Sequence, residues 1–342
     1  MRAIVIHAAR DLRIEDCPDE APGSGQLRLR LATGGVCGSD LHYYNHGGFG
    51  AVRLKEPMIL GHEVSAFVEE PGDTAFRRGQ LVAVSPSRPC GGCKFCLEGL
   101  PNQCLNMRFY GSAMPFPHIQ GAFRESLVAD ASQCVDASGL TAGEAAMAEP
   151  LAVTLHATRR AGEMLGKRVL VTGCGPIGML SILAARRAGA AEIVATDLSD
   201  FTLSLARKVG ADRVINTGSD PDALASYSAD KGYFDLLYEC TGVAVALAGA
   251  IAALRPRGVI LQLGLGGDMT LPMMAITAKE LDLRGSFRFH AEFATGVGLM
   301  QKGLIDVKPL ITHTIGLDQA ETAFRLASDR SQAMKTQIVF SG

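Results

Sequence analysis

Short apolar runs bounded by glycine or proline fill the first part of the chain, up to about residue 145. Their lengths and alternation predict strands at 3–7, 26–32, 63–69, 81–85 and 126–129. The segments between these strands read as loops. Several short strands separated by many turn residues are typical of an all-β, barrel-like module.

A second pattern begins near Thr141, where apolar runs of strand length alternate with stretches of helical periodicity. Strands are expected at 168–171, 192–196, 213–215, 234–239, 258–263 and 281–288. Helices are expected at 143–161, 177–188, 199–209 and 244–254, and later at 291–302 and 317–328, before a last strand at 336–340. This alternation predicts an α/β fold with a parallel sheet and right-handed crossovers.

The composition excludes several classes of partner. A chain of 342 residues is long enough for two domains, each with its own core. Basic residues number 33 against 35 acidic ones, so neither a nucleic acid nor an anionic membrane is expected. No apolar run approaches the roughly 20 residues that span a bilayer. The sequence begins directly as a strand without signal-peptide features, and we therefore expect a cytoplasmic protein with reduced cysteines.

Four of the nine cysteines lie close together, at Cys90, Cys93, Cys96 and Cys104. Four thiolates at this spacing can surround one ion tetrahedrally, which is the arrangement of a closed structural zinc site. Such a site has no free position for a substrate. The chemistry of the protein is therefore expected elsewhere.

Three other interpretations of the cluster are weaker. Two disulfides would need an oxidising compartment. A bacterial-type iron–sulfur run has its fourth cysteine after three residues and before a proline, whereas here seven residues intervene and Leu105 follows. A zinc ribbon for nucleic acid would have two separated knuckles and a basic face.

A glycine-rich segment follows the first strand of the alternating region. Its glycines are Gly173, Gly175 and Gly178, and Pro176 and Ile177 lie between them. The three glycines would allow a tight turn, close approach of a pyrophosphate, and close packing of helix on strand. The pyrophosphate would rest on the N-terminus of the helix. The motif alone is weak, but its place between a strand and a helix predicts a dinucleotide site.

Asp197 stands at the end of the next strand, nineteen residues after the last of these glycines. A carboxylate there accepts hydrogen bonds from the adenosine ribose and repels a 2′-phosphate, which favours NAD over NADP. Asp197 also precedes helical sequence and would suit a helix N-terminus. The two roles are compatible.

Sulfur, nitrogen and oxygen donors for a second, catalytic zinc are present in Cys37, His62 and Glu149. Three protein ligands and one open position are the mark of such a site. A lone cysteine or histidine is more often a packing residue than a ligand. Sequence alone does not bring the three together.

Five segments together form a specific pattern: 37–44, 60–63, 89–104, 148–151 and 173–178. Through them nearly the whole chain resembles the zinc-dependent medium-chain alcohol/polyol dehydrogenase family. Within it the sequence resembles the sorbitol dehydrogenase branch and, through 107–114, 231–235 and 283–289, its L-idonate 5-dehydrogenase subgroup. Ala66 and Leu105 depart from the usual glycine and proline of relatives.

The resemblance implies two domains and two zinc ions per subunit. A GroES-like β-barrel catalytic domain would comprise residues 1–147 and 289–342, and a Rossmann-type, doubly wound NAD-binding domain residues 148–288. The catalytic zinc ligands would be Cys37, His62 and Glu149, with Glu63 able to approach or exchange onto the metal. The structural zinc would be held by the four clustered cysteines.

Other roles are implied in the same way. Asp40 would orient the zinc-bound histidine. Ser39 and His42 would relay the proton of the substrate hydroxyl. Thr241 and Gly264 would contact the cofactor. The substrate pocket would contain Tyr43, Phe109, Tyr110, His118 and Arg288, and the guanidinium of Arg288 suits a carboxylate or vicinal hydroxyls.

The expected activity is NAD-linked oxidation of a secondary alcohol of a sugar acid, with L-idonate to 5-keto-D-gluconate as the first candidate. A sorbitol- or xylitol-type polyol is the alternative. A non-catalytic relative is a remote third interpretation, since the expected catalytic residues and the glycine motif are all present. The family also implies a homodimer or homotetramer.

Overall fold

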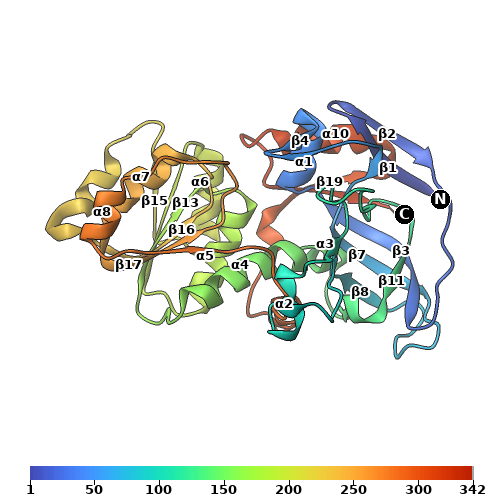
Figure 1. Cartoon of the computed structure of the whole chain (residues 1–342). Coiled ribbons are helices and arrows are strands. Elements are labelled where there is room, and N and C mark those ends of the chain that lie inside the picture. Colours follow the sequence, from blue (N-terminus) through green and yellow to red (C-terminus); the bar gives the residue numbers. More distant parts are fainter. Residues whose placement is uncertain (341–342) are drawn as a thin grey trace.

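The computed structural model describes residues 1–340, and it contains two sheet-based units that lie side by side (Figure 1). The first unit is built around a seven-stranded sheet in the order β12-β8-β7-β3-β20-β19, with β11 also paired to β3. Its strands are β3 (Gln26–Gly35), β7 (Glu63–Glu70), β8 (Leu81–Val84), β11 (Ser126–Asp130), β12 (Cys134–Asp136), β19 (Ile311–Gly316) and β20 (Lys335–Val339).

Smaller elements complete this unit. A three-stranded sheet has the order β2-β1-β6, and the pairs β4–β5 and β9–β10 are short. Their bounds are β1 (Arg2–Ala8), β2 (Asp11–Asp16), β4 (Gly48–Phe49), β5 (Val52–Arg53), β6 (Met58–Ile59), β9 (Ser87–Arg88) and β10 (Arg108–Phe109). Alternate side chains of β3 and β7 point into a core that includes Leu29, Leu31, Val64 and Ala66.

A helix stands where the sequence predicted a loop. Helix α1 (Gly38–His46) begins after Cys37, whose backbone N–H donates to the Asp40 carboxylate at 3.0 Å. This contact satisfies one free donor of the first turn. The helix ends at Gly47, which has the left-handed conformation (φ 67°) common at this position. The prediction missed α1 because a nine-residue helix without a Ser, Thr, Asp or Asn cap has little sequence signal.

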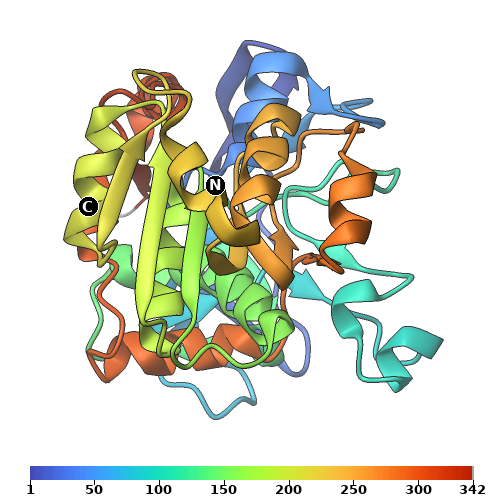
Figure 2. The ribbon, with the colours of Figure 1, turned by 90° about the vertical axis from the view of Figure 1, so that its left-hand side faces the viewer.

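The second unit contains six parallel strands in the order β15-β14-β13-β16-β17-β18. They are β13 (Arg168–Thr172), β14 (Glu192–Asp197), β15 (Arg213–Asn216), β16 (Phe234–Glu239), β17 (Leu254–Gln262) and β18 (Asp282–Gly285). In chain order this is 3-2-1-4-5-6, the doubly wound arrangement that places ligands at the carboxyl ends of the strands where the order reverses. Figure 2 looks towards this unit, with its yellow and green strands side by side.

The helices of this unit are α4 (Ala148–Ala161), α5 (Pro176–Arg187), α6 (Asp200–Lys208), α7 (Ala244–Ala253), α8 (Met273–Ala278), α9 (Glu292–Gln301) and the 3₁₀ segment η3 (Ala223–Lys231). Interior strand residues such as Val169, Leu170 and Val171 are fully buried. This burial on both faces explains why these strands read as continuous apolar runs. The expected combination of a β-rich unit and a Rossmann-type, doubly wound parallel sheet is therefore present.

Two predicted elements differ from the structure. The helix predicted at 143–161 is divided into α3 (Ala142–Ala146) and α4 at Met147. Pro150 explains the break, because its ring would clash with the carbonyl of Ala146 in one continuous helix. The strand predicted at 281–288 ends at Gly285, and Arg288 has a positive φ of 55°, which no strand residue adopts.

The C-terminal segment returns to the first unit. After η4 (Lys308–Leu310), β19, η5 (Leu317–Gln319) and α10 (Ala320–Ser328), strand β20 pairs antiparallel with β3. Residues at both ends of the chain therefore build the same sheet, as Figure 1 shows in blue and red. The exact domain limits at 147/148 and 288/289 stay a prediction.

Candidate metal and cofactor site

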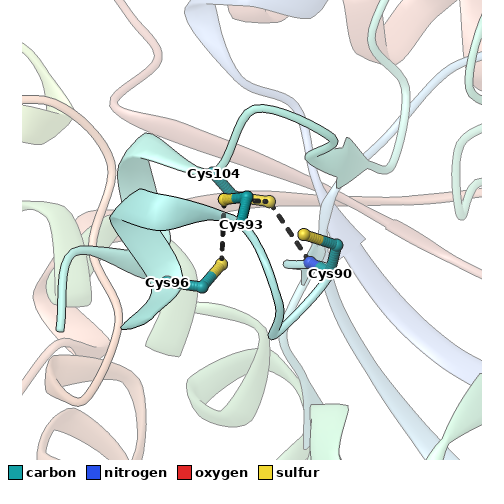
Figure 3. Close-up of side chains that lie close together, drawn as sticks. All are labelled: Cys90, Cys93, Cys96 and Cys104. Carbon is teal, nitrogen blue, oxygen red and sulfur yellow. Dashed lines mark hydrogen bonds between the residues drawn. The ribbon is translucent and has the colours of Figure 1, made fainter. Parts of the chain in front are cut away.

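The four clustered cysteines lie in a small lobe around α2 (Lys94–Leu97) and the 3₁₀ turn η1 (Pro101–Gln103) (Figure 3). The Sγ atoms of Cys93 and Cys96 are 3.6 Å apart, and those of Cys93 and Cys104 are 3.9 Å apart. Four sulfurs at 2.3 Å from a zinc ion would be about 3.8 Å from one another in a tetrahedron. The ligating atoms of all four lie within 4.8 Å of one another, so the set fits one ion.

Backbone donors point at these sulfurs. The N–H groups of Cys90 and Asn106 donate to the Cys104 sulfur at 3.2 and 3.3 Å. Backbone hydrogen bonds, first that from Gly92, lower the pKa of the Cys90 thiol to about 6. All nine cysteines of the chain are free thiols. Burial, in contrast, raises the pKa of the Cys96 thiol to about 12, so the hydrogen bonds favour the thiolate, the form that binds metal, at Cys90 in particular.

A second group of possible ligands lies between the two units. The Cys37 thiol, a ring nitrogen of His62 and a carboxylate oxygen of Glu63 lie within 4.8 Å of one another. Cys37 follows the end of β3, whereas Glu63 opens the neighbouring strand β7 and His62 precedes it. Strand pairing thus brings together residues that are distant in the sequence.

The side chain of Asp40 contacts the residues of this group. Its buried carboxylate accepts the backbone N–H groups of Cys37 and Gly61 at 3.0 and 3.2 Å. The same carboxylate lies 3.7 Å from Nδ1 of His62, a buried atom with no hydrogen-bond partner. Nδ1 therefore faces the carboxylate, and Nε2 is left to face a metal.

Glu63 has a cationic partner that the sequence did not suggest. The ammonium of Lys335 donates to both carboxylate oxygens at 2.9 and 2.7 Å, and both side chains are almost fully buried. Lys335 also donates to the carbonyl of Val36. A buried ion pair persists when its groups are hydrogen-bonded in this way.

Glu149 lies in the first turn of α4, beside Cys37, His62 and Glu63. It is not among the residues whose ligand atoms lie within 4.8 Å of one another. The pKa of Glu149 is raised to about 8, chiefly by burial; the nearby His62 and Lys335 oppose this rise, whereas Glu63 and Cys37 contribute to it. Burial likewise raises the pKa of Cys37 to about 12. Buried acids crowded in this way are ionised only near a cation, so thiol, imidazole and carboxylate together fit a divalent metal.

Helix α1 also carries the residues expected to move a proton. The hydroxyl of Ser39 lies 3.5 Å from Nε2 of His62, on the side where a metal would bind. His42 is one turn further along the helix and exposed, with its ring near His46 and Phe49. Burial of part of the ring lowers the pKa of His42. Ser39 therefore faces the candidate metal group, and His42 faces solvent.

Arg288 reaches the same region from the segment after β18. Its guanidinium lies 4.4 Å from the ring centre of Phe109 and 4.8 Å from that of Phe287. The Phe109 ring is 5.6 Å from the His62 ring, so it bridges the arginine and the metal group. Burial lowers the pKa of Arg288, and the charge of Glu149 opposes this. No carboxylate within residues 1–340 forms an ion pair with it.

The other residues predicted to line the substrate pocket form hydrogen bonds within the protein. The Tyr43 hydroxyl accepts the backbone N–H of Ala113, and its ring packs on Phe49. Both ring nitrogens of His118 are occupied, by the N–H of Lys55 and the carbonyl of Pro115. Tyr110 packs against the barrel core, and its hydroxyl donates to Gln133. His118 and Tyr110 therefore offer no free polar atom to a substrate.

A cavity of about 620 Å³ runs from Cys37 and Glu63 to the glycine-rich loop. Gly173 has a positive φ of 83°, and a Cβ on Gly178 would lie 1.8 Å from the Gly173 carbonyl. Gly175 directly precedes α5, and a Cβ there would meet no protein atom within 4 Å. Two glycines are thus required for packing, and the third leaves free space at the N-terminus of the helix, as a bound anion needs.

Asp197 lies at the far end of the cavity, where β14 ends. One carboxylate oxygen accepts the N–H of Cys174 and the other accepts those of Leu198 and Ser199. Thr241, Pro176 and Ile177 also line the cavity, whereas Gly264 borders a second hollow. Thr241 and the loop behind it are held by the buried Glu239 carboxylate.

Comparison with known proteins decides the family. Two family models match the chain, an alcohol dehydrogenase GroES-like domain over residues 23–139 and a zinc-binding dehydrogenase over residues 176–302. L-idonate 5-dehydrogenase (NAD(P)(+)) of Escherichia coli K12 is 45% identical over 91% of this chain and 91% of its own length. The chain belongs to the zinc-dependent medium-chain dehydrogenase family.

One further relative and one solved structure match nearly the whole length of this dehydrogenase. Human sorbitol dehydrogenase is 36% identical over 94% of the chain and 91% of its own length. The crystal structure of L-idonate 5-dehydrogenase from E. coli superposes with a TM-score of 0.95, at 41% identity over 99% of this chain and 97% of that one. Among residues 1–340 of the dehydrogenase, no helix is long and apolar enough to cross a membrane.

Two residues of the site were missed by sequence reasoning. Lys335 and Arg330 line the cavity although they follow α10, far along the chain from the other site residues. A lone lysine or arginine near the end of a chain reads as a surface residue. Lys335 directly precedes the strand predicted at 336–340, and its polar neighbours Thr336 and Gln337 gave no sign that it is buried.

Proposed function

We propose that the protein is an NAD-linked zinc dehydrogenase that oxidises a secondary alcohol of a sugar acid, with L-idonate as the first candidate. One observation carries the substrate class: Arg288 is a partly buried cation beside the metal group without a carboxylate partner among residues 1–340. A buried charge is costly unless a counter-ion pairs with it. The carboxylate of a sugar acid supplies this partner in bidentate geometry.

The aromatic rings fix where such a carboxylate would lie. Phe109 and Phe287 hold the guanidinium between them and limit its movement. Because Phe109 also contacts the His62 ring, the carboxylate would lie on the Arg288 side of the metal group. A hydroxyl further along the same sugar chain then reaches the metal. This supports oxidation at a carbon remote from the carboxylate.

We propose Cys37, His62 and Glu149 as the catalytic zinc ligands, and Glu63 as a carboxylate that can approach the metal or exchange onto it. Both oxygens of Glu63 are held by Lys335, so binding a metal would require it to weaken a buried ion pair. Glu149 has no such partner in the described part of the chain, and burial raises its pKa, so a nearby cation would stabilise its ionised form. The four cysteines of the lobe would hold the structural zinc.

Bound zinc supplies a Lewis acid that makes the substrate hydroxyl more acidic, and bound NAD accepts the hydride. Ser39 takes the hydroxyl proton, since its hydroxyl lies on the metal side of His62. His42, three residues further on the same helix, delivers the proton to solvent. The site thus has an inner proton acceptor and an outer one.

The choice of NAD rests on Asp197. Its carboxylate faces the cavity at the end of β14, where an adenosine ribose would lie, and it would repel a 2′-phosphate. A neutral polyol is the second candidate substrate, because sorbitol dehydrogenases match nearly the whole chain and a guanidinium also binds vicinal hydroxyls.

A substrate panel tests the proposal: L-idonate, gluconate, sorbitol and xylitol, each with NAD and with NADP. We expect the highest kcat/KM with L-idonate and NAD. Arg288→Gln should raise KM for the sugar acid by about 10- to 100-fold, the loss of a charged hydrogen-bonded pair, and change KM for sorbitol little. A preference for sorbitol that Arg288→Gln leaves unchanged would favour the polyol alternative.

We also propose a homo-oligomer in the cytoplasm. Strand β18 is the edge strand of the parallel sheet, and exposed Leu283 and Phe287 lie in it and just after it. An apolar sheet edge is a surface that natural proteins cover. The cytoplasmic location is supported by the spacing of the four cysteines, which fits metal ligands, a role that needs thiols kept reduced. Light scattering distinguishes dimer from tetramer.

A further inference from the structure

The arginine proposed to bind the substrate carboxylate stands at an unusual point of the backbone. Arg288 has a positive φ of 55°, in the left-handed region that a long side chain seldom adopts. A residue persists there only where its surroundings fix the backbone. After Arg288 the chain enters the core at once, since the Phe289 ring is buried and stacks on the Phe293 ring. The backbone before Arg288 needs a constraint of its own.

One hydrogen bond reaches the peptide that decides this conformation. The side-chain amide of Asn102 donates to the Phe287 carbonyl at 3.0 Å. This carbonyl belongs to the planar unit that joins Phe287 to Arg288. Because φ of Arg288 is the rotation between that unit and the Arg288 Cα, a bond that holds the carbonyl also holds φ. The hydrogen bond therefore fixes the direction in which the arginine side chain leaves the backbone.

Neighbouring hydrogen bonds hold the end of β18 but not this peptide. Nε of Arg160 donates to the Gly285 carbonyl at 2.6 Å. The backbone N–H of Ser286 donates to the Gln262 carbonyl at 3.1 Å. Within residues 1–340 no hydrogen bond other than that of the asparagine reaches the Phe287 carbonyl. The turn at the arginine thus depends on one donor.

That donor comes from the four-cysteine lobe. Asn102 lies in η1, two residues before Cys104, and is only 9% exposed. The turn is closed by the N–H of Cys104, which donates to the Pro101 carbonyl at 3.1 Å. A metal bound by Cys104 would fix the turn further. The lobe, whose closed set of sulfurs has no position for substrate, therefore contacts the segment that carries the substrate arginine.

We propose that Asn102 is a positioning residue for the substrate: its hydrogen bond to Phe287 holds the Arg288 guanidinium beside the metal group, so the four-cysteine lobe supports recognition of the sugar acid. This rests on the proposed function, because it requires a substrate carboxylate at Arg288. A guanidinium binds a carboxylate bidentately only in a defined orientation, so a backbone that can rotate weakens the contact. The effect falls on binding of the sugar acid and leaves the chemical step unchanged.

The test compares loss of this hydrogen bond with loss of Arg288 itself. Zinc-loaded wild type, Asn102→Asp, Arg288→Gln and the double variant are assayed with L-idonate and with sorbitol at saturating NAD. Aspartate keeps the shape of asparagine but has no N–H to donate. We expect Asn102→Asp to raise KM for L-idonate about 5- to 10-fold, and to change kcat and KM for sorbitol little. In the Arg288→Gln background it should have no further effect, because both residues act on one contact.

A second measurement needs no substrate. Hydrogen exchange followed by mass spectrometry should show faster exchange in residues 286–290 of Asn102→Asp, while the zinc content stays equal to that of the wild type. Gln103→Glu is the matched control, because it makes the same change from amide to carboxylate at an exposed side chain of the same turn. Its KM values and its exchange should equal those of the wild type.

Two results would overturn the positioning role of Asn102. One is a rise in KM that is equal for L-idonate and sorbitol, or that persists in the Arg288→Gln background. The other is unchanged exchange in residues 286–290. A wild type that oxidises no sugar acid would refute the proposed function instead, and the exchange measurement would still decide whether Asn102 holds the turn.

Discussion

The two metal groups of this dehydrogenase are built in opposite ways. The lobe takes four identical donors from one short segment, Cys90 to Cys104, and its cysteines range from exposed to buried. The other group combines thiol, imidazole and carboxylate from separate segments, beside a cavity and over the buried Asp40. Four sulfurs close a coordination sphere, whereas three mixed donors leave a position for substrate.

The difference extends to the charges around each group. The lobe relies on backbone N–H groups to stabilise its sulfurs. The inner group has its own ammonium, Lys335, which neutralises Glu63 in a buried ion pair. Because Lys335 pairs with Glu63, this carboxylate can stay near a metal without being a permanent ligand. Such an arrangement suits a site whose metal ligands change during a reaction.

Cys37→Ser should separate the two groups most sharply. A serine hydroxyl is a poor zinc ligand, and we expect kcat to fall at least about 1000-fold, the several kcal/mol that a Lewis acid contributes. Zinc content by mass spectrometry should fall from two ions per chain to one. Cys17→Ser, remote from both groups, is the control. A zinc-replete serine variant with normal turnover would contradict the assignment.

Removal of Lys335 tests the buried cation. Lys335→Met leaves the Glu63 carboxylate buried and unpaired, which should cost about 3–5 kcal/mol of unfolding free energy. Adding Glu63→Gln should recover much of this loss, because the double variant buries no charge. Denaturant titration of the four proteins in this cycle measures the coupling. Strictly additive losses would mean that the ion pair contributes nothing to the fold.

Cys104→Ser tests the lobe. Loss of a structural metal should reduce the unfolding free energy by about 2 kcal/mol or more and expose the lobe to proteases, while kcat per folded molecule stays near the wild-type value. Thermal unfolding, limited proteolysis and zinc content measure these effects. A variant that keeps its stability but loses kcat would reverse the roles of the two groups.

The sequence predicted the lobe better than the inner group, for a physical reason. Cysteines that are close in the sequence must also be close in space, because the chain joins them. Their spacing in the sequence therefore predicts the geometry of the metal site. The same holds for the glycine-rich turn between β13 and α5, whose role depends on local backbone. The alternating strands and helices were also predicted closely, because buried strands and amphipathic helices have strong periodicity.

Long-range contacts were beyond the sequence. Lys335 and Glu63 are 272 positions apart, and only the return of β20 to β3 brings them together. Helix α1 and the turn at Arg288 were missed because a short helix and a single left-handed residue leave little trace in local composition. The family resemblance could name Cys37, His62 and Glu149, and Asp40 behind the histidine, but not the ion pair between Glu63 and Lys335.

Asp40→Asn is expected to have the smallest effect and the most selective one. Asparagine keeps the shape of the side chain but removes the charge that faces Nδ1 of His62, and such second-layer changes weaken metal binding about 10- to 100-fold. Competition with a chelator should therefore show one of two zinc ions released more easily, while the lobe zinc is unaffected. Asp73→Asn is the control, since its carboxylate also accepts a backbone N–H, that of Gly25, far from both groups. Equal weakening of both zinc ions would mean that Asp40 acts on general stability, whereas selective weakening means that it orients the histidine of the open site.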